Sequence, residues 1–223
     1  MLILSVACAV ACAVAGSVAV NAADPVYSVN VVGYVNMTFT NNQFKLFTNP
    51  LDHTNTYAAL FPNLTASDKG SIIYQWDSTN GYSYALYAGT SRGWVDLETG
   101  LSANEWTLAP GQGAFFYSVQ TFTNTFVGNV MQGSLSFPIA AGFTQVGSIV
   151  PQAASVADLG LVPLNRDMIY KWNGTDYEYW QYANSKWRNL KSGAVEIPTL
   201  DVGDAVFYYS DTGFNWTRTF EVK

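Results

Sequence analysis

The sequence predicts an all-β protein of two tandem homologous antiparallel meander modules, sandwich or barrel-like, with one short helical turn each. Three observations predict this fold: an internal repeat, strand-like runs separated by turn residues, and the composition. The 223 residues are 49% hydrophobic and 15% aromatic but only 12% charged, which excludes a disordered tail and a coiled coil. The chain is long enough to bury a sizeable core without disulfide bonds.

The most informative pattern is the internal repeat. The string IIYQWD at residues 72–77 recurs as MIYKWN at residues 168–173. The string LAPGQGAFFY at residues 108–117 recurs, with a slip of one residue, as LDVGDAVFYY at residues 200–209. Two matches in the same order are hard to obtain by chance, so the chain is predicted to be a tandem duplication.

Each copy has the pattern of a β meander. Residues 72–76 and 82–87 are β-branched and aromatic runs on either side of an Asn-Gly turn, which predicts a hairpin. A third strand is expected to begin at Trp94. The Pro-Gly ending at Gly111 and the Val-Gly ending at Gly203 then mark a turn into the strand rich in Phe and Tyr.

Two short stretches are predicted to be helical. They are residues 54–61 and 155–159, which occupy equivalent places in the two copies. Ser155 and Asp158 form an S-x-x-D capping pattern at the start of the second stretch. Both are only one or two turns long, so each module is expected to carry one helical turn on a β framework.

The first residues look like a secretion signal. Residues 2–20 are an apolar run rich in Ala and Val that ends in an A-x-A-like cleavage site, so residues 1–22 are predicted to be a cleaved signal peptide. A retained membrane anchor is the alternative. No Lys or Arg precedes the run, so the start codon is expected upstream. The mature chain then has copy one at residues 23–128 and copy two at 129–223, with no membrane span.

Charge and reactive residues limit the functions. Ten Lys and Arg against sixteen Asp and Glu give a net charge of -6, which disfavours nucleic acid and anionic membranes as partners. The single histidine, His53, lacks the partners of a triad or a zinc site, and most acids lie at turns. We therefore predict no enzyme and no cofactor. Asp201 and Asp204 are weak candidate calcium ligands.

Several strings resemble a known kind of module. FKLFTNP at residues 44–50, the I-Y-x-W-D hairpin and P-G-Q-G-A-F-F resemble β modules of large secreted and surface proteins of Gram-negative bacteria. VGYVN at residues 32–36 is similar to the entry of short secreted proteins built from one such pair. The resemblance implies an extracellular or cell-surface location, with the periplasm as the alternative, and no shared catalytic residues. Copy two departs from this module pattern at residues 147–151 (GSIVP) and at residues 202–204 (Val-Gly-Asp). The resemblance therefore does not predict the geometry of these two loops in copy two.

The aromatic residues divide into two groups. Trp76 and Trp172 recur at equivalent positions, and so do Trp94 and Trp187, so these four are predicted to be structural. Trp76 and Trp172 are expected in equivalent, largely buried sites. The tryptophans that occur in one copy only are the better candidates for a surface role: Trp106, Trp180 and Trp216.

One strand carries the candidate ligand contact. Period-2 alternation places Glu178, Trp180 and Tyr182 on one face of a strand. An exposed stripe of acid, Trp and Tyr would stack on sugar rings or contact another subunit. Trp106 and Trp216 are included in this candidate site, either for a sugar or for a subunit contact.

The sequence is compatible with three functions. The favoured one is a non-catalytic structural or cell-surface protein that self-associates as a coat or filament subunit, with copies of itself or other surface proteins as partners. The alternative is an extracellular polysaccharide-binding module, and a hydrolase is third. Self-association is expected to run head to tail through the terminal strands, at residues 27–35 and 217–222, if their edges are unpaired.

Overall fold

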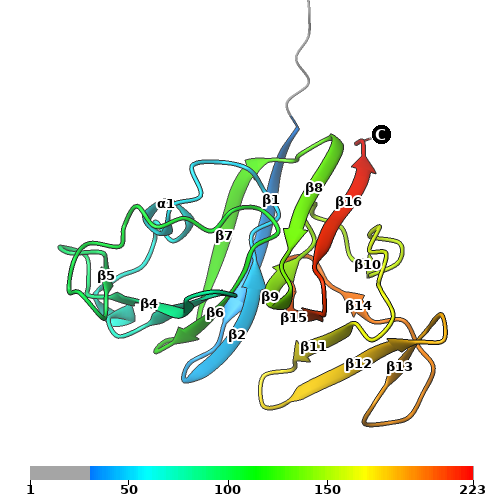
Figure 1. Ribbon diagram of the computed structural model, residues 1–223. Coiled ribbons are helices and arrows are strands. Elements are labelled where there is room, and N and C mark those ends of the chain that lie inside the picture. Colours follow the sequence, from blue (N-terminus) through cyan, green and yellow to red (C-terminus); the bar gives the residue numbers. More distant parts are fainter. Residues whose placement is uncertain (1–30, 223) are drawn as a thin grey trace, which may run out of the picture.

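The computed structural model describes residues 31–222, so the predicted signal peptide lies outside the described residues. Antiparallel strands make up nearly all of the regular structure, and the all-β prediction is confirmed. Figure 1 shows two groups of strands side by side, and no sheet of the described range closes on itself. Within residues 31–222, no helix is long and apolar enough to cross a bilayer.

Module one, the first group of strands, consists of a five-stranded sheet and a two-stranded ribbon. The sheet has the order β2-β6-β3-β4-β5, and β1 pairs with β7 in the ribbon. The strands are β1 (Val32–Phe39), β2 (Gln43–Thr48), β3 (Ile72–Asp77), β4 (Gly81–Tyr87), β5 (Trp94–Asp96), β6 (Gly113–Ser118) and β7 (Phe122–Asn129).

Module two repeats this arrangement strand for strand. Its sheet has the order β9-β15-β11-β12-β13, and β8 pairs with β16 in its ribbon. The strands are β8 (Gly133–Ile139), β9 (Gly142–Gly147), β11 (Met168–Trp172), β12 (Tyr177–Ala183), β13 (Lys186–Asn189), β15 (Ala205–Ser210) and β16 (Phe214–Phe220). A small additional pair joins β10 (Ala154–Ser155) to β14 (Thr199–Leu200).

The loops of the two modules agree despite their different sequences. Gly111 and Gly203 both have φ near +84°, a left-handed conformation that glycine adopts readily, so Val-Gly-Asp makes the same kind of turn as Pro-Gly-Gln. The Asn49 carboxamide bridges both backbone groups of Leu51, and the hydroxyl of Ser148 does the same for Val150. The departures of copy two from the repeat therefore preserve these local contacts.

The helical predictions are met in one module. α1 (Tyr57–Leu60) begins after Thr56, whose hydroxyl accepts the N–H of Ala59 at 3.3 Å. In module two the expected capping contact forms, from the Asp158 N–H to the Ser155 hydroxyl at 3.1 Å, but the segment remains a hydrogen-bonded turn. A 3-10 turn at η1 (Ala66–Asp68) was not predicted.

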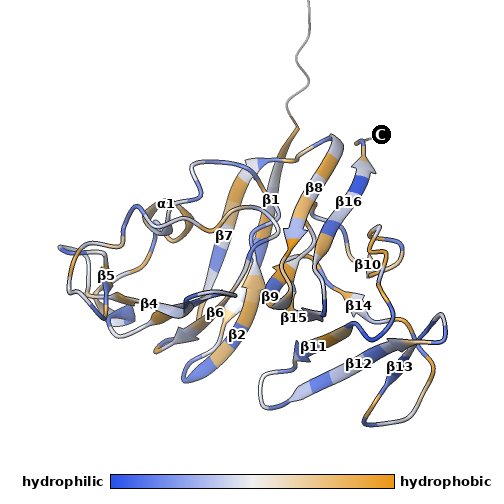
Figure 2. Cartoon of the chain, in the orientation of Figure 1, coloured by the Kyte–Doolittle hydropathy of each residue, from blue (hydrophilic) through white to orange (hydrophobic). Residues whose placement is uncertain are grey.

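Each module has its own apolar core between the inner face of its sheet and its ribbon. Figure 2 shows the apolar segments (orange) on β2, β7 and β8 that contribute to these cores. The largest fully buried side chains of module one are aromatic: Phe39, Phe47, Tyr57, Trp94, Phe116 and Phe126. Module two is built more from aliphatic side chains together with Trp180, Trp187, Tyr208 and Trp216.

Each terminal strand is paired along one edge. β1 pairs with β7 over its whole length, and β16 pairs with β8, in both cases inside one module. The duplication explains this pairing, since each copy contains both strands of its own ribbon. A strand of the same module thus occupies one edge of β1 and one edge of β16, while residues 27–30 of the predicted first strand lie outside the described residues. Head-to-tail association through the remaining edges stays a prediction.

Candidate functional site

The two modules meet through one edge strand of each sheet and the strand next to it, with β2 and β6 lying against β9 and β15. Two equivalent hydrogen bonds join them, from Thr48 N–H to the Gly203 carbonyl and from Gly147 N–H to the Gly111 carbonyl, each 2.9 Å. A side chain at Gly147 would lie 2.4 Å from Cγ2 of Thr48, a residue of module one, so only a glycine lets the two modules approach this closely there. The junction therefore has pseudo-twofold symmetry.

The outer face of each sheet, the side away from the module's own core, is covered with aromatic rings. Along each strand the alternate residues point into the core, as Ile73 and Phe116 do in module one. The outer face of module one carries Phe44, Tyr74, Trp76, Tyr82, Tyr84, Phe115 and Tyr117. The outer face of module two carries the equivalents Phe143, Tyr170, Trp172, Tyr177, Tyr179, Phe207 and Tyr209.

The rings also pack in the same way in both modules. The ring centroids of Trp76 and Tyr82 are 5.0 Å apart with an interplanar angle of 70°, and those of Trp172 and Tyr177 are 5.0 Å apart with an angle of 64°. Edge-to-face contacts of this kind hold aromatic rings in fixed orientations. The duplicated face is therefore an ordered surface rather than a loose apolar patch.

Two tryptophans connect the modules. The indole Nε1–H of Trp76 donates to the carbonyl of Phe143 at 2.8 Å, and that of Trp172 donates to the carbonyl of Phe44 at 3.0 Å. Trp76 and Trp172 occupy equivalent sites of intermediate burial, so neither is mainly exposed to solvent and neither is fully buried. Their recurrence reflects the module junction, where each ring covers the neighbouring module and keeps part of its surface exposed.

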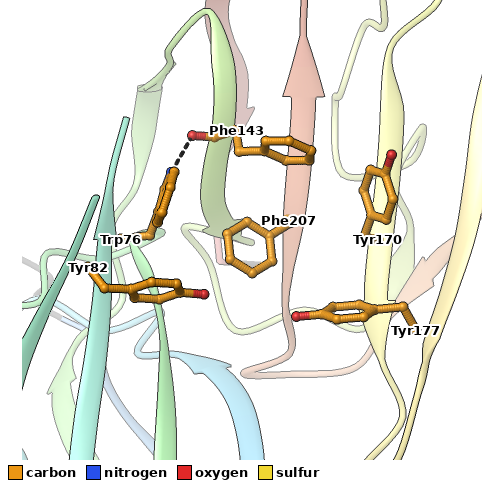
Figure 3. A pocket seen from close by; sticks show the side chains of 6 residues that line it. All are labelled: Trp76, Tyr82, Phe143, Tyr170, Tyr177 and Phe207. Carbon is orange, nitrogen blue, oxygen red and sulfur yellow. Dashed lines mark hydrogen bonds between the residues drawn. The ribbon is translucent and has the colours of Figure 1, made fainter. Parts of the chain in front are cut away.

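A groove lies over this junction. One part of it, a cleft of about 380 Å³, is lined only by Trp76, Tyr82, Phe143, Tyr170, Tyr177 and Phe207. The second part, a cleft of about 340 Å³, is lined by Phe44, Tyr74, Tyr82, Tyr84, Phe115, Trp172 and Tyr177. We call the two clefts together the aromatic groove. Figure 3 shows that the hydroxyls of Tyr82 and Tyr177, which line both clefts, point toward each other.

The aromatic groove has no charged side chain in its lining. Its polar groups are tyrosine hydroxyls, and those of Tyr74, Tyr82, Tyr84 and Tyr177 make no hydrogen bond to another described residue. Burial, with smaller contributions from Tyr177 and Tyr84, raises the pKa of Tyr82 to about 12, and burial also raises the pKa of Tyr177. The hydroxyls of Tyr82 and Tyr177 therefore remain neutral at neutral pH and can both donate and accept hydrogen bonds.

A polar cleft of about 210 Å³ adjoins the aromatic groove at Phe44 and Trp172, and Asp204 is among its lining residues. The Asp204 carboxylate accepts from Lys171 Nζ at 2.8 Å and from the Asp201 N–H at 3.1 Å. This carboxylate therefore pairs with Lys171 and closes a turn. Among the described residues no cluster of three or more His, Cys, Asp and Glu could hold a metal ion, so the structure lends no support to a calcium site at Asp201 and Asp204.

Trp180 and Trp216 are not at the surface. They are 6% and 4% exposed, and both belong to the core of module two. Trp216 stands on β16 where β7 has Asn124, and both side chains donate to an equivalent carbonyl, Leu159 at 3.0 Å and Leu60 at 2.9 Å. The surface prediction for these two tryptophans is therefore wrong, because a residue found in one copy only can serve the core of that copy.

The stripe on β12 has the predicted period but faces the core. Trp180 and Tyr182 point inward, and only Glu178, at the end of the stripe, is exposed. The outer face of β12 instead carries Tyr177 and Tyr179. Alternation fixes which residues share a face but does not tell which of the two faces is covered.

The remaining candidates are dispersed. Trp106 is half-buried against the core of module one, with its ring centroid 6.2 Å from that of Tyr57. The structure therefore separates Trp106, in module one, from the other candidates, and it places Trp216 with Trp180 and Tyr182 in the core of module two instead of at a surface site. The exposed His53 accepts the N–H of Thr54 through its Nδ1 at 2.6 Å.

Comparison with known proteins adds no further information. No family model matches the chain, and neither the curated proteins nor the solved structures contain a match.

Proposed function

We propose that the protein is a secreted, non-catalytic cell-surface β protein whose aromatic groove binds polysaccharide. The observation that carries this proposal is the duplicated aromatic lining of an open groove, with tyrosine hydroxyls as its polar groups. The apolar run at residues 2–20 and the resemblance to surface modules support secretion.

The lining suits a sugar chain. The C–H faces of sugar rings stack on aromatic rings, while their hydroxyls need hydrogen-bonding partners nearby. Trp76, Trp172 and the groove tyrosines supply both kinds of contact, since the rings are half-buried and the hydroxyl of Tyr82 has no protein partner among the described residues. An open groove that crosses two modules accommodates an extended chain better than a compact small molecule.

The experiment is affinity electrophoresis of the mature protein in gels that contain a panel of soluble polysaccharides. Retardation by at least one of them is expected, and it should be lost in the double variant Tyr82→Ala/Tyr177→Ala, because both rings line both clefts. Tyr34→Ala is the matched control, since Tyr34 is 70% exposed on β1 outside the groove. Retardation that depends on Tyr34 as much as on the groove pair would overturn the proposal.

Self-association as a surface coat is the second candidate, and one observation favours it. Val32, Tyr34 and Val127 are exposed on the outer face of the β1–β7 ribbon, with Tyr34 directly opposite Val127. An apolar patch of this kind is a contact surface for another copy of the chain. Sedimentation at increasing concentration tests it: assembly that Tyr34→Ser abolishes would support this role, and a monomer at every concentration would reject it.

A further inference from the structure

We infer that the aromatic groove contains two equivalent subsites for one neutral glycan chain, one on each side of the Tyr82–Tyr177 pair. The inference rests on the proposed function and specifies the ligand and its stoichiometry. Subsite A is the cleft that contains Trp76, and subsite B is the cleft that contains Trp172.

The equivalence of the subsites follows from the pairing of their residues. Each residue of subsite A has its structural counterpart in subsite B, and Tyr84 alone is extra in subsite B. In subsite A the ring centroids of Phe143 and Tyr170 are 5.6 Å apart, and in subsite B those of Phe44 and Tyr74 are 5.5 Å apart. Two sites with the same rings in the same geometry bind the same chemical unit.

The subsites are continuous because they share residues at the pseudo-twofold axis. Tyr82 and Tyr177 belong to both, and the rings of Phe115 and Phe207 are 6.2 Å apart across the axis. A chain that fills one subsite therefore runs into the other without leaving the aromatic surface. Binding to the second subsite becomes intramolecular, which raises affinity without any new kind of contact.

The lining also selects the charge of the chain. No Lys, Arg or His lines either subsite, so a uronic acid or sulfated sugar would lose water around its charge without gaining an opposite one. The net charge of -6 disfavours polyanions at longer range as well. Neutral, equatorially linked glycans present apolar C–H faces and carry no such penalty, so they are the class that fits.

The test is isothermal titration with β-1,4-linked gluco-oligosaccharides and N-acetylglucosamine oligosaccharides, from the disaccharide to the hexasaccharide. At least one series should show affinity that rises with length by about tenfold or more, because longer chains engage both subsites. Two molecules of the shortest fragment that binds should be bound per protein, one in each subsite. Only one molecule of the longest oligosaccharide should be bound per protein, because it fills both subsites.

Two matched variants examine the subsites separately. Tyr170→Ala damages subsite A only, and Tyr74→Ala damages subsite B only. Each should reduce the affinity for the longest chain to about that of the short fragment and should leave one site for the short fragment. Circular dichroism should show that both variants remain folded. A variant that does not fold is replaced by Tyr170→Leu or Tyr74→Leu, which keeps apolar bulk but removes the stacking ring.

The failures of the two proposals are distinguishable. The two-subsite inference is overturned if a glycan binds but only one of the Tyr74 and Tyr170 variants weakens binding. It is also overturned if the affinity does not rise with chain length. In both cases the proposed function stands. A stronger preference for oligouronates overturns the selection of neutral chains. Binding of no glycan in either experiment overturns the proposed function itself.

Discussion

Trp76 and Trp172 make the same hydrogen bond in opposite directions across the module junction, each from its indole Nε1–H to a backbone carbonyl of the other module. Each indole therefore projects from the sheet of its own module and contacts the edge strand of the other module. Together with the two backbone hydrogen bonds of the junction, this pair holds the two aromatic faces next to each other.

Replacing one of these indoles should weaken the junction. Trp172→Phe keeps an aromatic ring but removes the donor to the Phe44 carbonyl, so the free energy of unfolding should fall by about 1 kcal/mol. Trp76→Phe should cost a similar amount. Urea denaturation measures both. Trp106→Phe is the control, because the Trp106 indole has no hydrogen-bond partner among the described residues; an equal loss there would assign the effect to ring size alone.

Trp216 should affect stability and leave binding unchanged. Trp216→Phe removes the donor to the buried Leu159 carbonyl, which should cost about 1–3 kcal/mol of folding stability. Affinity for the glycan should be unaffected, since Trp216 lies in the core of module two. Denaturation and titration of the same variant provide both values. A variant of unchanged stability that loses binding would contradict the core position.

Asp96 should act as a turn-stabilising residue. Its carboxylate accepts the Glu98 N–H at 3.0 Å, and in module two the Asn189 carboxamide accepts the Lys191 N–H at 2.9 Å. The other carboxylate oxygen of Asp96 accepts from the Thr99 hydroxyl. Asp96→Asn should therefore lower the melting temperature less than Asp96→Ala, because asparagine keeps one acceptor oxygen and alanine keeps none. Equal effects of the two substitutions would show that the charge, and not the acceptor, matters.

Stability should fall in strong alkali as the groove tyrosines ionise. Burial raises the pKa of Tyr82 from 10.0 to about 12, so between these values the folded state holds a proton that the unfolded state releases. The contribution is fully present below pH 10 and is lost as the pH rises through the folded pKa. Urea denaturation at successive pH values measures the slope. Tyr82→Phe should make the fall of stability with pH shallower. An unchanged slope would show that a group other than Tyr82 causes the loss of stability.

The strands and turns could be predicted from the sequence because local chemistry determines them. The turn at Gly111, the hairpin after Ile72 and the strand at Trp94 each depend on residues close in the chain. The groove could not be predicted in the same way. On β12 the alternation of Tyr177 and Tyr179 with Trp180 is visible, but which set faces the core depends on strands distant in sequence.

Tryptophans recur between the two copies for two different structural reasons. Trp94 and Trp187 recur because each fills the core of its own module. Trp76 and Trp172 recur because a pseudo-twofold axis relates the two modules at the junction. The equivalent tryptophan of each copy therefore contacts the other module. A single copy gives no sign of that axis, so the sequence could not separate the two reasons.

The most direct test of the account uses the indole N–H signals in a nitrogen-correlated NMR spectrum of the protein. On addition of the tightest-binding oligosaccharide, the signals of Trp76 and Trp172 should shift together, because these two indoles line the aromatic groove. The indoles buried in the module cores should stay in place: Trp94, Trp180, Trp187 and Trp216. Saturating binding that leaves the signals of Trp76 and Trp172 unmoved would contradict the assignment of the groove as the binding site.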